Sequence, residues 1–208
     1  MTNAKARPSM ITAGSDKSSA IAWQVPAGLA VAIVLTQAMG PSVHAVLAYD
    51  RAAIAAGEVW RMLTCSFVHL SGYHCFLNVL GLAAYALLCP GRPSGFEWAA
   101  RLAALSFGVS AGLYAFAPNV GTYVGLSGAM HGLFVLGLWP LAARRDLIAI
   151  GCLVFLAAKI AWELAFGVPV SDATSIGGRV VTESHLFGTL AALVYGLAMK
   201  GLGHSGET

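Results

Sequence analysis

The sequence predicts an all-α fold, a polytopic membrane protein of six transmembrane helices, and two observations support this class. Of its 208 residues, 58% are hydrophobic and only 10% are charged, whereas soluble domains carry about 25% charged residues. The apolar residues also fall into six stretches, each close to the roughly 20 residues that a membrane-spanning helix needs. The formal net charge of +3 is too small to indicate a nucleic-acid partner.

The six helices are expected over residues 21–40, 72–89, 97–117, 123–141, 146–166 and 185–202. Proline, glycine and charged residues separate them, and the short linkers leave no room for a soluble domain. We therefore expect one membrane domain, 21–202, between a disordered cytoplasmic tail (1–20) and a short cytoplasmic tail (203–208). A signal peptide is not expected, because no small-residue cleavage site closes the first apolar run.

The basic residues predict the orientation. Eight of the 12 lie in the N-terminal tail, in or beside the second and fourth linkers between helices, and at the C-terminus: Lys5, Arg7, Lys17, Arg92, Arg101, Arg144, Arg145 and Lys200. Basic residues concentrate on the cytoplasmic side of membrane proteins, so both termini are expected in the cytoplasm. The second, fourth and sixth helices would then enter the membrane from the outer face.

These three helices each carry polar residues near their outer ends. His74 and Asn78 begin the second, Ser127 lies in a Gly-Leu-Ser-Gly sequence at the start of the fourth, and His185 begins the sixth. The clusters should therefore share one depth in the membrane. A serine, a histidine and additional hydrogen-bond donors at one level indicate acyl-transfer chemistry.

Ser127 needs a base within about 3 Å to accept its proton, and His185 is the preferred candidate. Gly188, one turn below His185, would let the sixth helix approach the glycine-rich fourth closely. A histidine that only caps a helix at the interface is the structural alternative for His185. His131 is the rival base, but it lies on the same helix as Ser127, so we favour a supporting role beside His185 over the role of base. A bond to a neighbouring helix is the structural alternative for His131.

The second helix offers donors for the oxyanion that acyl transfer creates. His74 and Asn78 lie four residues apart, hence on one helix face, and together with the Ser127 backbone N–H they could hold that oxygen. No His-Glu-x-x-His sequence accompanies His69 and His74, so a metal site is disfavoured. No cofactor is expected.

Two further features leave alternatives open. Lys159 and Glu163 are spaced to pair on the fifth helix, and we favour a role in fixing the bundle over binding a substrate charge. The outer loop 41–71 contains Trp60 and Arg61, which either guide substrate entry or only anchor the loop at the interface.

The four cysteines, Cys65, Cys75, Cys89 and Cys152, show no zinc or Cys-x-x-Cys spacing. Cys65 and Cys75 could pair only if the segment between them turns back. We favour free thiols that pack as small apolar residues.

In order along the chain, these motifs resemble the rhomboid superfamily of intramembrane serine proteases, and more closely its rhombosortase branch. The resemblance spans roughly residues 57–196. It rests on four motifs, each matched residue by residue: Trp60-Arg61 in the first outer loop, His74 and Asn78 as His-x-x-x-Asn, Gly125 to Gly128 as Gly-x-Ser-Gly, and His185 with Gly188 as His-x-x-Gly.

The resemblance implies that Ser127 is the nucleophile and His185 the base, with His74 and Asn78 lining the oxyanion hole. Many rhomboids have tyrosine four residues after the serine, where this chain has His131, as rhombosortases do. Many also have a second glycine where this chain has Ala192, which affects how tightly the sixth helix packs.

A rhombosortase-like protein is expected in the bacterial cytoplasmic (inner) membrane, with its active site toward the periplasm. Its partners would be membrane-anchored exported proteins whose C-terminal tail carries a Gly-Gly pair, a transmembrane helix and basic residues, and it would cleave that tail, with a lipid-derived amine as the possible acceptor. The alternatives are a general rhomboid protease of other membrane helices, an inactive rhomboid-like protein that only binds helices, and a small-molecule transporter.

Overall fold

Helices make up most of the computed structural model, which describes residues 14–89, 91, 93–169 and 173–204. Six of them are long: α1 (Gly14–Ala38), α5 (Gly72–Leu88), α6 (Gly95–Phe116), α7 (Ser127–Ala143), α8 (Leu147–Phe166) and α10 (Glu183–His204). The remaining elements are α2 (Pro41–Leu47), β1 (Tyr49–Asp50), α3 (Arg51–Ala55), α4 (Arg61–Thr64), the 3-10 helix η1 (Cys65–Phe67), β2 (Thr122–Tyr123) and α9 (Ala173–Ile176).

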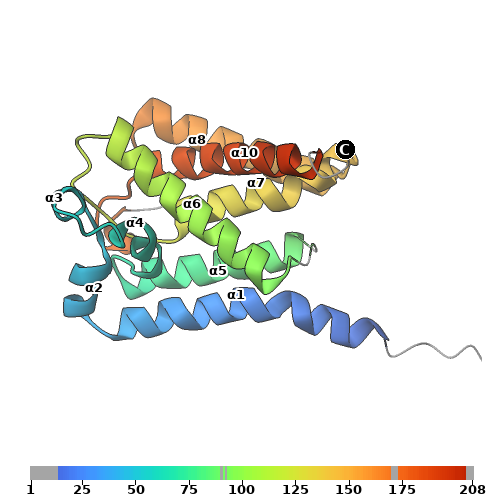
Figure 1. The fold of residues 1–208 in the computed structure, drawn as a ribbon, viewed down its shortest axis with the longest axis horizontal. Coiled ribbons are helices and arrows are strands. Elements are labelled where there is room, and N and C mark those ends of the chain that lie inside the picture. Colours follow the sequence, from blue (N-terminus) through green and yellow to red (C-terminus); the bar gives the residue numbers. More distant parts are fainter. Residues whose placement is uncertain (1–13, 90, 92, 170–172, 205–208) are drawn as a thin grey trace, which may run out of the picture.

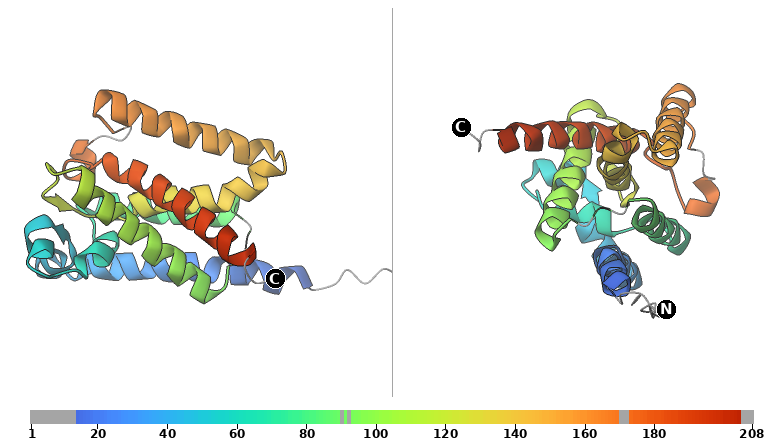
Figure 2. Two further views of the ribbon diagram at one scale, coloured as in Figure 1. Left: turned by 45° about the horizontal axis from the view of Figure 1, so that its top comes forward. Right: turned by 90° about the vertical axis from the view of Figure 1, so that its right-hand side faces the viewer.

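The long helices form a bundle with the short elements gathered at one end (Figure 1). Helix α7 packs against α5, α6, α8 and α10, while α1 lies at the periphery against α5 (Figure 2). Helices α5, α7 and α10 all begin at the end where α2, α3 and α4 lie (Figure 1). The start of α1 and the end of α10 lie at the opposite end of the bundle (Figure 1). That this end of the bundle faces the cytoplasm stays a prediction.

Local sequence signals explain where several helices start. The Ser71 side chain accepts a hydrogen bond from the backbone N–H of His74 at the start of α5. Ser94 and Glu97 form a reciprocal capping box at the start of α6, and Asp146 caps α8. Each cap satisfies a backbone donor that the first helical turn leaves without a partner.

Five of the six expected helices agree with the structure to within four residues at each end; α1 does not. Helix α1 begins at Gly14, so residues 14–20, expected in a disordered tail, are helical. The helix can continue through residues 15–20 because no proline or glycine interrupts them. The expected start at residue 21 is the start of the apolar stretch, which indicates where a helix crosses the membrane but not where the helix begins. The rest of that tail, 1–13, and residues 205–208 lie outside the described residues.

Helix α7 starts four residues later than expected. Thr122 and Tyr123 form a strand that pairs antiparallel with Asp50 and Tyr49, and Gly125 follows with φ +121°. An extended pair and a left-handed residue cannot belong to an α-helix. Ser127 is therefore the first residue of α7, rather than lying one turn inside it.

The number of membrane crossings stays a prediction. Among the described residues, Gly95–Phe116 and Leu147–Phe166 are each long and apolar enough to cross a membrane. Two sharply bent pairs, Trp23–Ala38 with Pro41–Leu47 and Arg61–Phe67 with Gly72–Leu88, would meet the same test if each were one span. The mostly helical architecture with two to four candidate spans fits a membrane protein.

Arg51 fixes the loops at the end where the short helices gather. The Arg51 guanidinium donates to the carbonyls of Leu113 (2.6 Å) and Ala117 (2.8 Å) at the end of α6. The Leu113 carbonyl also accepts from the Ala117 backbone N–H (3.1 Å), and basic side chains commonly bond the last carbonyls of a helix. The loop around β1 is thereby tied to the loop that leads to Ser127.

All four cysteines are free thiols, so Cys65 and Cys75 do not pair. The Cys65 Sγ lies 3.4 Å from Ser110 Oγ on α6, and the Cys75 Sγ lies 3.7 Å from the Ile33 carbonyl oxygen on α1. The two thiols face different helices, as small buried residues of the packing.

Helices α7 and α10 meet through glycines. A Cβ atom added to Gly188 would overlap the carbonyl group of Gly128, and one added to Gly132 would lie 2.5 Å from the Gly188 carbonyl oxygen. Backbone therefore contacts backbone at this point, as small residues permit between membrane helices. This is the close approach expected from Gly188, and Ala192 is buried one turn farther along.

We predict that Gly188→Ala destabilises the protein, because the added methyl group can be accommodated only if α10 moves away from α7. Overpacking of this kind costs about 1–3 kcal/mol. The control is Gly196→Ala on the same helix, where the nearest atom to the added Cβ lies at 3.7 Å and alanine favours the helix. Thermal unfolding in detergent should give a lower midpoint for Gly188→Ala only; equal midpoints would contradict the close contact.

Candidate active site

Ser127 is presented by a sharp turn between β2 and α7. The backbone N–H of Gly125 donates to the Cys65 carbonyl (2.9 Å), and the Tyr123 hydroxyl donates to the Gly125 carbonyl (2.8 Å). Burial raises the pKa of Tyr123, so its hydroxyl stays protonated and remains a donor. Only glycine fits at position 125, because its φ is positive and a Cβ atom there would lie 2.8 Å from the His74 ring.

The structure brings Ser127 and His185 together, as the sequence predicts. The Ser127 Oγ lies 3.1 Å from His185 Nε2, across the contact between α7 and α10. His185 is buried. This distance is within the range for proton transfer between a nucleophile and its base.

His131 lies against His185 rather than against the Ser127 hydroxyl. The two imidazole rings are stacked, with centroids 4.1 Å apart and an interplanar angle of 16°. The His131 Nδ1 lies 2.7 Å from the Ser127 carbonyl oxygen, which can only accept, so Nδ1 carries the proton. The expected placement beside His185 is therefore what the structure has.

Glu163 contacts the ring nitrogen of His185 that does not face Ser127. The sequence did not predict this contact. Its Oε2 lies 2.7 Å from His185 Nδ1, and its Oε1 lies 2.6 Å from Lys159 Nζ. The Glu163 side chain is 1% exposed. The available signal was its position in the outer half of the fifth helix, but its spacing of four to Lys159 led us to favour a role of the pair in fixing the bundle over binding a substrate charge.

His74 and Asn78 are both buried but differ in what they reach. Because the Leu70 backbone N–H donates to His74 Nδ1 (3.3 Å), the ring proton resides on Nε2. Asn78, one turn farther along α5, donates to the His74 carbonyl (2.9 Å), and its Oδ1 has no hydrogen-bond partner among the described residues. His74 lines the cavity beside Ser127, whereas Asn78 does not.

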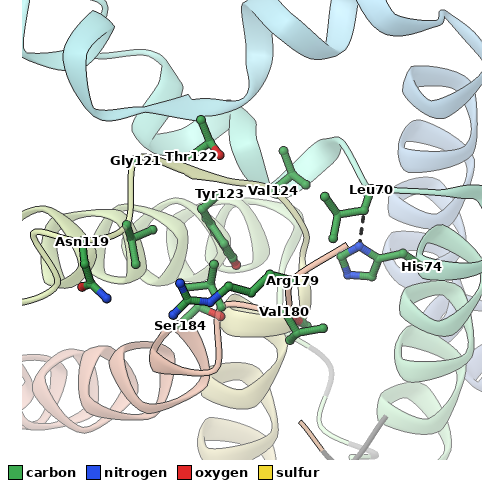
Figure 3. Close-up of a pocket in the computed structure, with 13 residues that line it drawn as sticks. Leu70, His74, Asn119, Gly121, Thr122, Tyr123, Val124, Arg179, Val180 and Ser184 are labelled. Atoms are coloured by element: carbon green, nitrogen blue, oxygen red, sulfur yellow. Dashed lines mark hydrogen bonds between the residues drawn. The ribbon is translucent and has the colours of Figure 1, made fainter. Parts of the chain in front are cut away.

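A cavity of about 350 Å³ opens beside Ser127. Figure 3 shows His74 and Asn119 on opposite sides of it, with the Arg179 side chain between them. Ser184 from the start of α10 also lines it. The loops before α7 and α10 supply most of its lining, in which Val120, Val124 and Val180 alternate with polar side chains.

Trp60 and Arg61 lie outside this cavity. Arg61 is buried and donates to the carbonyls of Ala45 (2.7 Å) and Ala48 (2.8 Å), and it pairs with Glu58 at 2.7 Å. Trp60 is exposed and donates to a carbonyl of α2 at 3.3 Å. Of the two roles considered for this motif, these contacts support anchoring of the outer loop.

No group of three or more His, Cys, Asp or Glu side chains in the described part of the chain is arranged to hold a metal ion. His69 packs edge-on against His74, and neither of its ring nitrogens has a hydrogen-bond partner in the part of the chain that the structure describes. Burial, and secondarily the neighbouring His74, lowers the pKa of His69 to about 3. His69 is therefore neutral and adds no charge beside the cavity.

Comparison with known proteins identifies the family to which the chain belongs. A model described as "Rhomboid domain" matches residues 56–201, which is well over half of the chain. No curated protein matches at a significant level. The matched range contains the turn at Ser127, the α7 and α10 contact and both ends of the Ser127–His185 hydrogen bond. The chain therefore belongs to the rhomboid family, whose members are intramembrane serine proteases and their relatives.

Proposed function

We propose that this protein is an intramembrane serine endopeptidase in which Ser127 is the nucleophile and His185 is the general base. The observation that carries the proposal is the 3.1 Å contact between Ser127 Oγ and His185 Nε2 at the wall of a cavity. A serine hydroxyl is a weak nucleophile until a base in contact accepts its proton. A protein that only bound membrane helices would have no use for this contact.

The reaction follows from the two contacting atoms. As Ser127 Oγ forms a bond to the scissile carbonyl carbon, its proton passes to His185 Nε2. The tetrahedral intermediate then loses its amine, which takes the proton from His185 as the C–N bond breaks. A second nucleophile, water or an amine, then gives its proton to His185 as it attacks the acyl carbon. His185 returns that proton to Ser127 Oγ as the bond between Oγ and the acyl group breaks, which restores the free enzyme.

Donors around Ser127 stabilise the oxyanion. The Ser127 backbone N–H is at the first turn of α7, where it has no partner within the helix, and the positive end of the helix favours negative charge. The Leu70 backbone N–H occupies His74 Nδ1, which leaves the Nε2 proton on the edge of the ring that faces Gly125, two residues before Ser127. Asn78 has two amide protons; one bonds the His74 carbonyl, and the second is the remaining donor.

For the substrate, we propose the C-terminal sorting tail of exported proteins, with a Gly-Gly pair before a transmembrane helix. His131 supports this rhombosortase-like assignment, because it fills the position four residues after the serine and stacks on the base. A lipid-derived amine is the proposed acceptor when the acyl group is transferred rather than hydrolysed. The protein would act at the periplasmic side of a bacterial inner membrane.

Substitution of either residue of the Ser127–His185 pair should abolish reaction with a fluorophosphonate probe. In detergent, wild-type protein should be labelled and Ser127→Ala should not, because the probe bonds to the activated oxygen. His185→Ala should lose labelling because no base remains. The matched control is Ser42→Ala, which removes an exposed serine on α2. Labelling of Ser127→Ala at the wild-type level would refute the mechanism.

Loss of an oxyanion donor should slow the reaction without removing it. We expect His74→Ala to reduce the labelling rate by about 10²–10³-fold, the usual cost of one such donor, and Asn78→Ala by about 10-fold to 1000-fold. His44→Ala on α2, whose ring bonds a backbone carbonyl of α1, serves as the control. Unchanged rates in both α5 variants would place the oxyanion elsewhere.

The substrate assignment predicts dependence on the Gly-Gly pair. A reporter with a Gly-Gly tail, hydrophobic helix and basic end should be processed in cells that express the protein, and a Val-Val tail should not. Mass spectrometry of the product separates hydrolysis, which leaves a free carboxylate, from transfer, which adds the mass of an amine. Equal processing of both tails would favour a general rhomboid protease.

A further inference from the structure

We propose that Glu163 is a positioning residue for His185, so that the site works through a Ser127–His185–Glu163 triad with Lys159 holding the carboxylate. This inference rests on the proposed protease function, which so far requires only the serine and the histidine. It assigns a role to the Lys159–Glu163 pair in place of a simple ion pair on one helix.

The geometry places the two partners of His185 on its two different nitrogens. Glu163 Oε2 lies 2.7 Å from Nδ1, and Ser127 Oγ lies 3.1 Å from Nε2. A carboxylate at Nδ1 can only accept, so Nδ1 carries the proton and Nε2 presents its lone pair to the serine hydroxyl. Glu163 thereby selects the tautomer that a general base needs, which is the function of the buried acid in serine-protease triads.

Lys159 explains how a carboxylate can be buried here. Its Nζ lies 2.6 Å from Glu163 Oε1, the oxygen that His185 does not use, and 3.2 Å from His131 Nε2. Since His131 donates through Nδ1 to the Ser127 carbonyl, its Nε2 is free to accept from the ammonium group. The hydrogen bonds thus form a ring that begins at the Ser127 hydroxyl, passes through His185, Glu163, Lys159 and His131, and ends at the Ser127 backbone carbonyl.

A role limited to helix packing does not account for this arrangement. Lys159 and Glu163 belong to the same helix, α8, so the bond between them does not link α8 to another helix. Among the described residues, the pair bonds to α10 through His185 and to α7 through His131. Glu163 is buried and Lys159 is partly buried. Burial of a charge costs several kcal/mol unless further hydrogen bonds satisfy it, and here those bonds are made by the base and the ring stacked on it.

The opposite charges also define what Glu163 contributes. Lys159 Nζ lies 3.2 Å from His185 Nδ1, nearly as close as the carboxylate, so the positive charge offsets much of the field that Glu163 exerts on the ring. Orientation and tautomer selection are therefore its principal effects. Its loss should lower the rate at which Ser127 reacts rather than the affinity for a substrate.

The test combines three variants with the fluorophosphonate probe. Glu163→Gln keeps the shape but donates to His185 Nδ1, which favours the wrong tautomer, and should slow labelling of Ser127 by about 10²–10⁴-fold. Glu163→Asp should recover part of the rate. The double variant Lys159→Met with Glu163→Leu removes the buried carboxylate together with its partly buried partner, so that neither charge is left unpaired, and should be as slow as Glu163→Gln.

Nitrogen-15 spectra of histidine-labelled protein give a readout that a packing role would not move. In wild type the His185 proton should reside on Nδ1, and in Glu163→Gln on Nε2, with the resonances assigned by comparison with His185→Gln. An Nε2–H tautomer in wild type would overturn the proposal, even if a variant failed to fold.

The remaining outcomes distinguish a failure of the role proposed for Glu163 from a failure of the proposed protease function. If wild-type Ser127 is labelled and the folded double variant is labelled equally fast, Glu163 is structural and the two-residue mechanism stands. If wild-type Ser127 is not labelled while the spectra show the Nδ1–H tautomer, the protease assignment fails, although the contact between Glu163 and His185 exists.

Discussion

The close contact of α7 and α10 at Gly128 and Gly188 is the constraint on which the site depends. Neither position has room for a Cβ atom, because each glycine faces a backbone carbonyl of the other helix. Ser127 precedes one of these glycines and His185 lies one turn before the other. The distance between nucleophile and base is therefore set by backbone packing, which is stiffer than any arrangement of flexible side chains.

An apolar helix bundle gives polar groups few partners, and this protein places its polar groups where they satisfy one another. Arg51 and Arg61 bind carbonyls at helix ends, while His185, His131, Glu163 and Lys159 bond among themselves and to Ser127. An unsatisfied donor or charge in such surroundings costs far more than it would in water. The same requirement that stabilises the bundle thus fixes the orientation of the histidine.

Most of the helices and the meeting of Ser127 with His185 could be predicted from the sequence, because apolar length, glycine spacing and basic residues are local signals. The start of α7 could not, since the strand at Thr122 and Tyr123 forms only by pairing with Tyr49 and Asp50, far away in the chain. The contact of Glu163 with His185 likewise depends on how α8 is rotated against α10. Periodicity within α8 reveals its spacing to Lys159 and nothing about that rotation.

Assembly of the site and folding of the bundle are consequently one event. Helix α7 supplies the nucleophile and the stacked ring, α10 the base, α8 the carboxylate, and α5 the His74 donor at the cavity wall. Each of these helices packs directly on α7. A displacement of α8 of even 1 Å would lengthen the 2.7 Å contact to His185 beyond normal hydrogen-bond length, while leaving the 3.1 Å contact between serine and base intact. The two contacts of the histidine can therefore respond separately to movements of different helices, although they act on the same ring.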